Sequence, residues 1–143
     1  MNVYLASPER CLYKGTETKK VAEWIKSIYP NTNIYCPQDY YRTIPCWKYP
    51  YPELDFAKQL FDKNLKHLEV ADLVVCVYSD IQIVSAAWEV GYAQAKNKEV
   101  WLIVPSYQYE KTSLMFITAN KVFSPAGPEN EITEINQDKF KWK

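Results

Sequence analysis

Short apolar segments alternate with amphipathic helical segments along most of this chain. The clearest apolar segment, Asp-Leu-Val-Val-Cys-Val-Tyr at residues 72–78, has no polar residue between its ends. An uninterrupted apolar run of this length is typical of a strand that is buried on both faces of a parallel sheet. A helical pattern precedes it at residues 53–70, and another follows it at about 85–96. This alternation predicts a parallel sheet with helices packed on both of its faces.

Five segments have the composition of strands, and we expect them at residues 3–6, 33–36, 72–78, 100–104 and 121–123. The first helix is expected to follow a cap at Thr16 or Thr18, and Pro30 prevents its continuation. We therefore predict an α/β fold in one domain over residues 1–143, built on a flavodoxin- or Rossmann-like, doubly wound, five-stranded parallel sheet. Residues 2–123 would form the core and residues 124–143 an irregular tail.

The helical segment before residue 71 has an apolar stripe that repeats every three or four residues, as expected for a helix packed on a sheet. Its members are Leu54, Ala57, Phe61, Leu65 and Leu68. A proline- and aromatic-rich segment precedes this helix at residues 37–52. Its aromatic rings could stack on a planar base, or they could form a packed lid or a subunit contact.

The composition excludes several classes of function. The 143 residues include 17 basic and 17 acidic side chains, and a net charge of zero argues against nucleic acid or an anionic membrane as the main partner. Gly15, Gly91 and Gly127 are the only glycines, and they lie too far apart to form a glycine-rich phosphate loop. No apolar run is long enough to span a membrane, and no secretion signal opens the chain. We therefore expect a cytoplasmic protein.

The thiols and the single histidine, His67, do not have the spacing of a metal site. The four cysteines, which contain no Cys-x-x-Cys pair, are Cys11, Cys36, Cys46 and Cys76. We expect buried or half-buried thiols in a reducing compartment and a surface or half-buried histidine. No metal or organic cofactor is implied.

Glu89 has the strongest indication of chemistry. From Ile83 to Ala95 it is the only ionisable acid, in a segment of otherwise apolar or small residues that follows the central strand. Doubly wound folds bind ligands beyond the carboxyl ends of their strands, so a carboxylate in the first turns of this helix would face the cleft. The helix dipole would favour its ionised form, and burial would oppose it. Such a group could be a nucleophile or base, or else a structural glutamate that caps a backbone group or pairs with a lysine.

Polar residues that follow the first two strands are further candidates. Tyr4 and Ser7 belong to the end of the first strand, where a tyrosine hydroxyl could bond to a carboxylate, or could be buried against a main-chain partner. Arg10 and Arg42, the only two arginines, follow the first and second strands. Either guanidinium could bind a phosphate, although arginines on exposed loops more often have no such role.

Taken in order, these motifs resemble the nucleoside 2-deoxyribosyltransferase family. The match runs through residues 3–6, Pro-Gln-Asp at 37–39, Ala-Asp-Leu-Val-Val at 71–75, Ala-Trp-Glu-Val-Gly-Tyr-Ala at 87–93, residues 100–105, Leu114-Met115 and Val122. The resemblance implies that Glu89 is the nucleophile, which attacks the anomeric carbon of a deoxynucleoside and holds a covalent glycosyl intermediate. It places the Tyr4 hydroxyl beside that nucleophile, and it implies substrate-binding roles for Asp39 and Met115.

The chain departs from the family pattern at three places. An aspartate on the helix before the central strand is replaced by Asn64, which can hydrogen-bond a sugar or base but cannot transfer a proton as a carboxylate does. The loop before the nucleophile carries Ile83-Val84-Ser85 instead of Asp-x-Gly, and an asparagine that the family receives from a neighbouring subunit is Ser113. Asp80 is a candidate for the vacant acid–base role.

The resemblance also bears on the size and class of the substrate. Ser7 and Ser85 stand where relatives often place glycine, so both side chains should narrow the pocket near the sugar and bind substrate there. The first hypothesis is transfer of a 2-deoxyribosyl group between nucleobases. The second is hydrolysis of a nucleoside or nucleoside 5′-monophosphate, for which Arg10 or Arg42 would suit the phosphate. The third is a nucleotide-binding protein with weakened catalysis.

The implied partners are small molecules and further copies of the chain. A nucleoside or nucleotide and a free nucleobase would be the substrates. Because the family completes its active sites across a subunit interface, the resemblance implies a homodimer or a larger homo-oligomer. The aromatic content of 15% suits such an interface.

Overall fold

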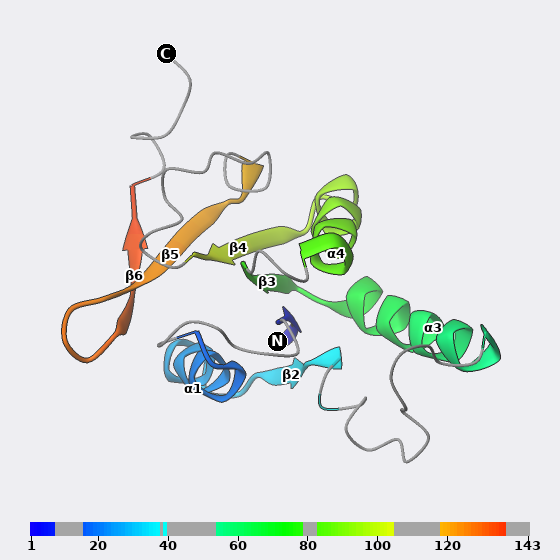
Figure 1. The fold of residues 1–143 in the computed structure, drawn as a ribbon, viewed down its shortest axis with the longest axis horizontal. Coiled ribbons are helices and arrows are strands. Elements are labelled where there is room, and N and C mark those ends of the chain that lie inside the picture. Colours follow the sequence, from blue (N-terminus) through cyan, green and yellow to red (C-terminus); the bar gives the residue numbers. More distant parts are fainter. Residues whose placement is uncertain (8–15, 38, 40–53, 79–82, 105–117, 137–143) are drawn as a thin grey trace.

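The computed structural model describes residues 1–7, 16–37, 39, 54–78, 83–104 and 118–136. These residues form one six-stranded sheet and three helices (Figure 1). The strands are β1 (Asn2–Ala6), β2 (Asn33–Tyr35), β3 (Leu73–Val77), β4 (Glu99–Ile103), β5 (Lys121–Ala126) and β6 (Glu131–Ile135). The helices are α1 (Thr18–Ile28), α3 (Leu54–Val70) and α4 (Ile83–Ala95).

The sheet has the strand order β2-β1-β3-β4-β5-β6, and its first five strands run parallel. This is the order of a flavodoxin-like, doubly wound sheet with one strand added, so the predicted fold class is confirmed. The chain reverses its direction across the sheet at β1 and β3, where Ala6 is the register partner of Cys76. Ligand sites of this architecture lie beyond the carboxyl ends of such strands.

The predicted end of the sheet was wrong. Strand β5 continues to Ala126, and β6 pairs with it antiparallel where an irregular tail was expected. The turn between them uses left-handed backbone at Gly127 (φ 73°) and Asn130 (φ 50°). Strand β6 has only two half-buried apolar residues, Ile132 and Ile135, and they contribute to opposite faces of the sheet. Its composition therefore carried too little apolar signal to predict a strand.

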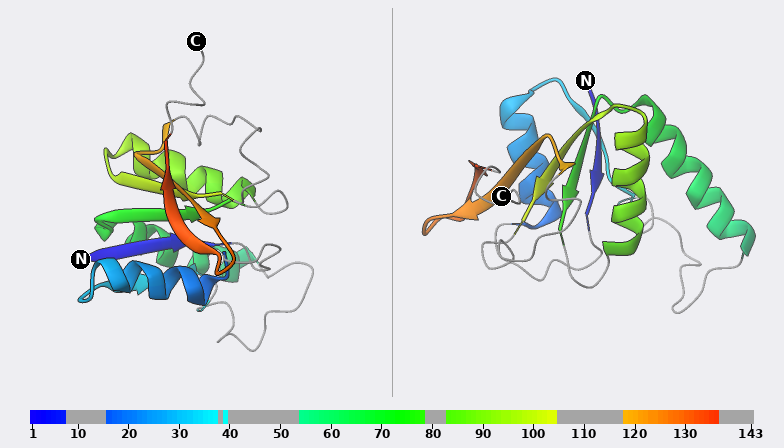
Figure 2. Two further views of the ribbon diagram at one scale, coloured as in Figure 1. Left: turned by 90° about the vertical axis from the view of Figure 1, so that its left-hand side faces the viewer. Right: turned by 90° about the horizontal axis from the view of Figure 1, so that it is seen from above.

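Helix α1 covers one face of the sheet, and α3 and α4 cover the other (Figure 2). Alternate residues of each strand supply the two faces, because successive side chains of a strand point to opposite sides. On β1, Val3 and Leu5 join the apolar cluster under α1, whereas Tyr4 and Ala6 join the cluster under α3 and α4. The two clusters are called here the α1 face and the α3/α4 face.

Two local predictions about the first two helices need correction. The N-cap of α1 is Glu17 without a side-chain cap bond, and the Thr18 hydroxyl instead lies 2.7 Å from the Ser7 hydroxyl. The helix ends before Pro30 as expected. On α3, Leu60 and Leu68 are buried, but Phe61, expected in the core stripe, is 48% exposed. The repeat of apolar residues identified the side of α3 that faces the sheet, but it did not predict how much of that side the sheet covers.

Several smaller expectations can be compared with the structure. Cys36 and Cys76 are buried free thiols and His67 is half-buried, as predicted, while Cys11 and Cys46 lie outside the described residues. Over the ranges that the structure describes, no helix combines the length and the apolar character needed to cross a membrane.

Candidate active site

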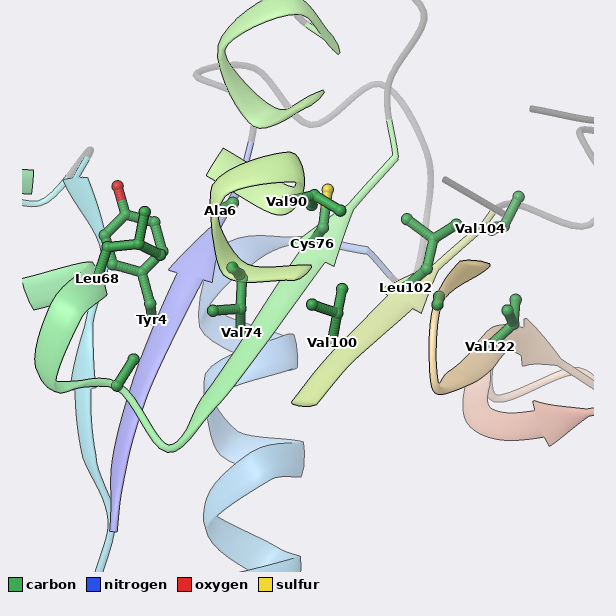
Figure 3. Close-up of a cluster of buried hydrophobic side chains, with 13 residues drawn as sticks. Tyr4, Ala6, Leu68, Val74, Cys76, Val90, Val100, Leu102, Val104 and Val122 are labelled. Atoms are coloured by element: carbon green, nitrogen blue, oxygen red, sulfur yellow. The ribbon is translucent and has the colours of Figure 1, made fainter. Parts of the chain in front are cut away.

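The α3/α4 face holds the predicted nucleophile. Helix α4 follows β3 and packs on this face through Val90, which belongs to one buried cluster with Tyr4 and Cys76 (Figure 3). Glu89 precedes Val90 and is half-buried. The helix begins at Ile83, two residues earlier than predicted, so Glu89 is its seventh residue and lies in the second turn. The influence of the helix dipole has largely decayed at that depth.

Tyr4 affects the titration of Glu89. Burial raises the pKa of the Glu89 carboxyl to about 7, and a hydrogen bond from the Tyr4 side chain opposes that rise. Burial is the larger effect, because a carboxylate loses more by leaving water than one donor restores. The sequence left open whether the helix dipole or burial would dominate, and burial does. Near neutral pH this carboxyl group therefore exists in both of its protonation states.

Cys76 on β3 is the third group of this cluster. Its side chain is fully buried, and burial together with the nearby charge of Glu89 raises the pKa of the thiol far above its ordinary value. The thiol is consequently protonated at neutral pH and acts as a small apolar side chain. Strands β1 and β3 and helix α4 thus bring Tyr4, Cys76 and Glu89 together.

A second group of side chains continues from Tyr4 toward α3. The ring centroids of Tyr4 and Tyr35 lie 5.6 Å apart. The Tyr35 hydroxyl donates a hydrogen bond of 2.8 Å to the side-chain oxygen of Asn64, and its ring stacks on His67 at 3.7 Å with an interplanar angle of 4°. Burial and the charge of Lys63 lower the pKa of His67, which favours the neutral imidazole. Asn64 is therefore connected to the Tyr4–Glu89 pair through one tyrosine.

Sequence reasoning missed Tyr35. The only available signal was its position at the end of the second predicted strand, which a structural tyrosine would share. Its importance depends on strand register, because Tyr4 and Tyr35 are direct partners in the β1–β2 ladder. That register places both side chains on the same face of the sheet.

The other predicted site residues are not joined to this group by the contacts that the structure describes. Ser7 is half-buried and bonded to Thr18, and Asp39 is exposed, with its backbone N–H bonded to the Cys36 carbonyl at 3.1 Å. Ser85 is the third residue of α4, and its side chain is not among those that the structure describes. Five further candidates lie outside the described residues: Arg10, Arg42, Asp80, Ser113 and Met115.

An aromatic surface lies next to Glu89 on α3 and α4. Phe61 and Trp88 are each 48% exposed, and their ring centroids lie 5.3 Å apart. Trp88 also stacks on Tyr92 at 5.7 Å. These three residues are called here the aromatic patch. Monomeric proteins seldom leave neighbouring large apolar side chains in water without a reason.

The described residues give no indication of a metal centre. Within the part of the chain that the structure covers, no three His, Cys, Asp or Glu side chains are grouped as metal ligands would be. A hollow of about 420 Å³ on α3 is lined by Gln59, Asp62, Lys63, Lys66 and His67, so it includes neither Tyr4 nor Glu89.

Comparisons with known proteins agree with the fold and with the family resemblance. A 2-deoxyribosyltransferase from the psychrotolerant bacterium Bacillus psychrosaccharolyticus has a similar structure, with a TM-score of 0.64 and 17% identity over 86% of this chain and 85% of that one. A conserved protein from Enterococcus faecalis V583 is similar with a TM-score of 0.56 and 20% identity over 78% of this chain and 67% of that one. At these identities the likeness concerns the fold.

No curated protein sequence matched the chain significantly. The model of the family described as nucleoside 2-deoxyribosyltransferase, however, matches residues 3–134. This range includes the segment that carries Glu89 and all six strands except the first residue of β1 and the last residue of β6. Because this match spans nearly the whole sequence, the chain belongs to the nucleoside 2-deoxyribosyltransferase family.

Proposed function

We propose that this chain transfers a 2-deoxyribosyl group from one nucleobase to another through a covalent intermediate on Glu89. Family membership indicates a function of the nucleoside 2-deoxyribosyltransferase type, with small nucleoside and nucleobase substrates. The observation that carries the finer proposal is the half-buried Glu89 carboxyl, with a pKa of about 7 and a hydrogen bond from Tyr4. A poorly solvated carboxylate beside an O–H donor is suited to attack carbon and to leave again.

In the first step, a carboxylate oxygen of Glu89 attacks the anomeric carbon of the deoxynucleoside. A new carbon–oxygen bond forms while the bond between the sugar and the base nitrogen breaks, and the base leaves with the electron pair and takes up a proton. The sugar is then held on Glu89 as a glycosyl ester. Asp80 is the candidate donor of that proton, since Asn64 has no acidic proton to give.

In the second step, a nitrogen of the incoming base attacks the same carbon and releases the Glu89 carboxylate. The incoming base loses a proton as its new bond forms, so the sugar has moved from one base to another without net uptake of water. Two displacements at one carbon retain its configuration. If water attacks instead, the product is free deoxyribose and the reaction is hydrolysis.

Tyr4 has a defined role in this scheme. A hydrogen bond from its hydroxyl lowers the pKa of Glu89 and would so favour the ionised form that attacks the sugar. When Glu89 becomes an ester, the same hydroxyl is released and can meet the sugar ring instead. Tyr4 would therefore stabilise the carboxylate both before attack and when it leaves.

We place the remaining predicted residues around this pair as substrate-binding groups. Asn64 would meet the sugar or the base, and the same role is proposed for Asp39, Ser7, Ser85, Ser113 and Met115. Arg10 and Arg42 would bind a phosphate if the substrate carries one. Each of these roles can be tested by substituting one residue and measuring the rate in the base-exchange assay described next.

The test is a base-exchange assay. The protein is incubated with a 2′-deoxynucleoside, with and without a second free base, and the products are followed by chromatography. The expected result is a new deoxynucleoside only when the second base is present. Free sugar without exchange would support the hydrolase instead, and binding without turnover would support the weakened nucleotide-binding protein.

Glu89→Ala tests the nucleophile, with Glu23→Ala as the matched control on the opposite side of the sheet. Glu23 is exposed on α1, so its neutralisation should leave the rate unchanged. Removal of Glu89 should lower the rate by roughly 10⁴-fold or more, in line with losses of other covalent nucleophiles. Mass spectrometry of the wild type mixed with donor alone should find one deoxyribosyl group on the peptide that contains Glu89. Exchange at the wild-type rate in Glu89→Ala would disprove the assignment.

We also propose that a second copy of the chain covers the aromatic patch. Helix α4 contains no charged side chain except Glu89, and its outward residues Trp88, Gly91 and Ala95 are exposed. A helix without a charged outer face is typical of a buried helix. An added Cβ at Gly91 would meet nothing within 4 Å, so a neighbouring subunit is one reason for a small residue there.

Light scattering tests this assembly. The wild type should be at least a dimer, and Trp88→Glu should shift it toward the monomer and lower base exchange. Ile28→Glu, on an exposed residue of α1, is the matched control and should leave the assembly intact. A monomeric wild type with full exchange activity would overturn the proposed assembly without affecting the role of Glu89.

A further inference from the structure

Tyr35 occupies a central position among the side chains of the α3/α4 face, although it was not among the predicted site residues. It is the last residue of β2, a strand of only three residues at the edge of the sheet. Its ring lies 5.6 Å from Tyr4, its hydroxyl bonds to Asn64, and its ring stacks on His67. One side chain thus contacts a strand residue and two helix residues.

We propose that Tyr35 is a positioning residue of the transfer site, whose ring supports Tyr4 and whose hydroxyl holds Asn64, so that both groups keep one fixed arrangement. The proposal rests on the proposed function, because it assigns Tyr35 a part in the reaction of Glu89. It adds a residue that does not itself touch the reacting carboxylate.

The ring contact is enforced by the sheet. Tyr4 and Tyr35 are register partners in a parallel ladder, so their side chains leave the sheet on the same face. Their tilted rings, with an interplanar angle of 43°, pack at a distance that is favourable for aromatic pairs. Tyr4 is fully buried, and a smaller side chain at position 35 would leave space into which its ring could move.

The contact with α3 fixes Tyr35 from the other side. Asn64 and His67 are three residues apart on α3, so they share one face of the helix. The 2.8 Å hydrogen bond from the Tyr35 hydroxyl to Asn64 fixes the position of the ring's outer end. The parallel stacking on His67 fixes the orientation of the ring plane. Motion of α3 relative to β1 would have to break one of these contacts.

The groups that titrate near this arrangement are few among the described residues. Glu89 is faced by Tyr4 from β1 and by Cys76 from β3, and Tyr35 is faced by His67, with Lys63 beside it on α3. Among the described residues, Tyr4 is the side chain that links Tyr35 to Glu89, so a change in the pKa of Glu89 after substitution of Tyr35 is expected to act through Tyr4. The pKa of the Glu89 carboxyl group therefore reports whether Tyr35 holds Tyr4 in place.

Two substitutions separate the two contacts. Tyr35→Phe keeps the aromatic ring and removes the hydrogen bond to Asn64. Tyr35→Leu removes both the aromatic ring and that hydrogen bond. The controls are Tyr29→Phe and Tyr29→Leu, because Tyr29 packs against Trp101 on the α1 face and its ring is half-buried like that of Tyr35. The first measurement is the pKa of Glu89 in the ligand-free protein, followed by carbon NMR of the carboxyl group.

Tyr35→Leu should raise the pKa of Glu89 by about half a unit or more, because the Tyr4 hydroxyl is no longer held against the carboxylate. Tyr35→Phe, Tyr29→Phe and Tyr29→Leu should leave that pKa unchanged. An unchanged pKa in Tyr35→Leu, or an equal shift in Tyr29→Leu, would overturn the proposal. This measurement requires no turnover, so it stands even if the proposed transfer reaction fails its own test.

The second measurement is kinetic. Tyr35→Phe should raise KM by roughly threefold to tenfold with little change in kcat. In a protein that already carries Asn64→Ala, the same substitution should change KM by less than about twofold, because the two residues act as a unit. Tyr35→Leu should lower kcat by about tenfold through Tyr4. Full additivity of Tyr35→Phe and Asn64→Ala would show that the hydroxyl does not act through Asn64 and would overturn that half of the proposal.

Discussion

The two faces of the sheet are built from the same strands but differ in chemistry. The α1 face is a dense aromatic and aliphatic cluster, in which Trp24 lies 4.8 Å from Phe123 and 5.9 Å from Trp101. The α3/α4 face is also apolar at its centre, but it includes the Tyr4 hydroxyl and the Cys76 thiol, and Glu89 lies beside them. The clustered residues of the α1 face include the Cys36 thiol and Tyr29 but no carboxyl group, whereas the second face has Glu89 beside it.

This difference separates stability from chemistry within one layer of strands. Burial of apolar area stabilises the α1 face, where the Trp101 indole N–H also donates to the Glu99 carboxylate at 2.7 Å. Burial of a carboxyl group on the other face costs free energy unless it is protonated or hydrogen-bonded. The pKa of Glu89 is raised because burial makes its ionised form less favourable, so the folded protein holds the proton more tightly. Substitutions on the two faces should therefore be distinguishable by what they change.

The largest effect on stability is expected at Trp101. It is 3% exposed on the α1 face, and its ring lies 5.1 Å from Phe123. Trp101→Ala should lower the free energy of unfolding by about 3–5 kcal/mol, as loss of a buried large aromatic ring generally does. Urea unfolding measures this, and Trp101→Phe provides a milder variant that keeps a ring. In either folded variant the pKa of Glu89 should be unchanged, and a shift would contradict the separation of the two faces.

The next effect is a gain of stability from Glu89→Gln at high pH. The pKa of Glu89 is raised in the folded protein, from an ordinary 4.5 to about 7, so the folded state holds the proton more tightly than the unfolded state. Its contribution to stability is full below pH 4.5 and is lost as the pH rises through 7. At pH 8 the variant should exceed the wild type by about 2–3 kcal/mol, with the two converging near pH 4.

The same titration has the opposite sign for catalysis. In the proposed reaction Glu89 must be ionised to attack the sugar, so the proposed base exchange should increase as the pH rises through about 7. Over one pH series, the free energy of unfolding of the wild type relative to Glu89→Gln should therefore fall while its rate of base exchange rises. A wild type that gains stability relative to Glu89→Gln between pH 5 and 8 would contradict the burial of this carboxyl group.

A smaller effect is expected from Tyr4→Phe, which removes one hydroxyl from the α3/α4 face. Without the Tyr4 donor, the ionised form of Glu89 loses stabilisation, so its pKa should rise and exchange at pH 7 should fall by about tenfold. Tyr29→Phe on the α1 face is the matched control and should leave the rate unchanged. The pH–rate profile checks the cause: its midpoint should move to higher pH only in Tyr4→Phe.

The smallest effect concerns Lys98, which precedes β4 and bonds to backbone groups at the end of α3. Its ammonium group donates to the Glu69 and Ala71 carbonyl oxygens at 2.7 and 2.9 Å, at the end of α3. Lys98→Met keeps the aliphatic stem and should lower the free energy of unfolding by about 1 kcal/mol. The rate of exchange and its pH midpoint should not change. A shifted midpoint would show that the end of α3 also controls the site.

Much of the fold was predictable because the central strands are uninterrupted apolar runs. Strands β1, β3 and β4 and the helices between them follow from that pattern, and with them the flavodoxin-like order. Strand β6 was not predictable, because an edge strand with two half-buried residues lacks the pattern of a buried one. The cap of α1 was also wrong, since the Thr18 hydroxyl bonds to Ser7, a partner distant in the sequence.

The candidate site divides in the same way. Glu89 was identifiable because an ionisable residue within an apolar helix is chemically conspicuous, and because its neighbours match a family motif. Tyr35 was not identifiable, because a tyrosine at the end of a short strand has no distinguishing local pattern. Its contacts depend on β1–β2 register and on the position of α3.

The sequence by itself thus determined the class of fold, the family and the residue that carries the proposed chemistry, since hydrophobic period and motif order are local properties. Only the tertiary structure decided the electrostatic state of that residue and the side chains that surround it. A pKa depends on how much water is removed and which donor lies nearby, and both are set by packing between distant segments. The alternation of apolar segments was sufficient to build the sheet, but the meeting of β1, β2, α3 and α4 made one of its faces a candidate active site.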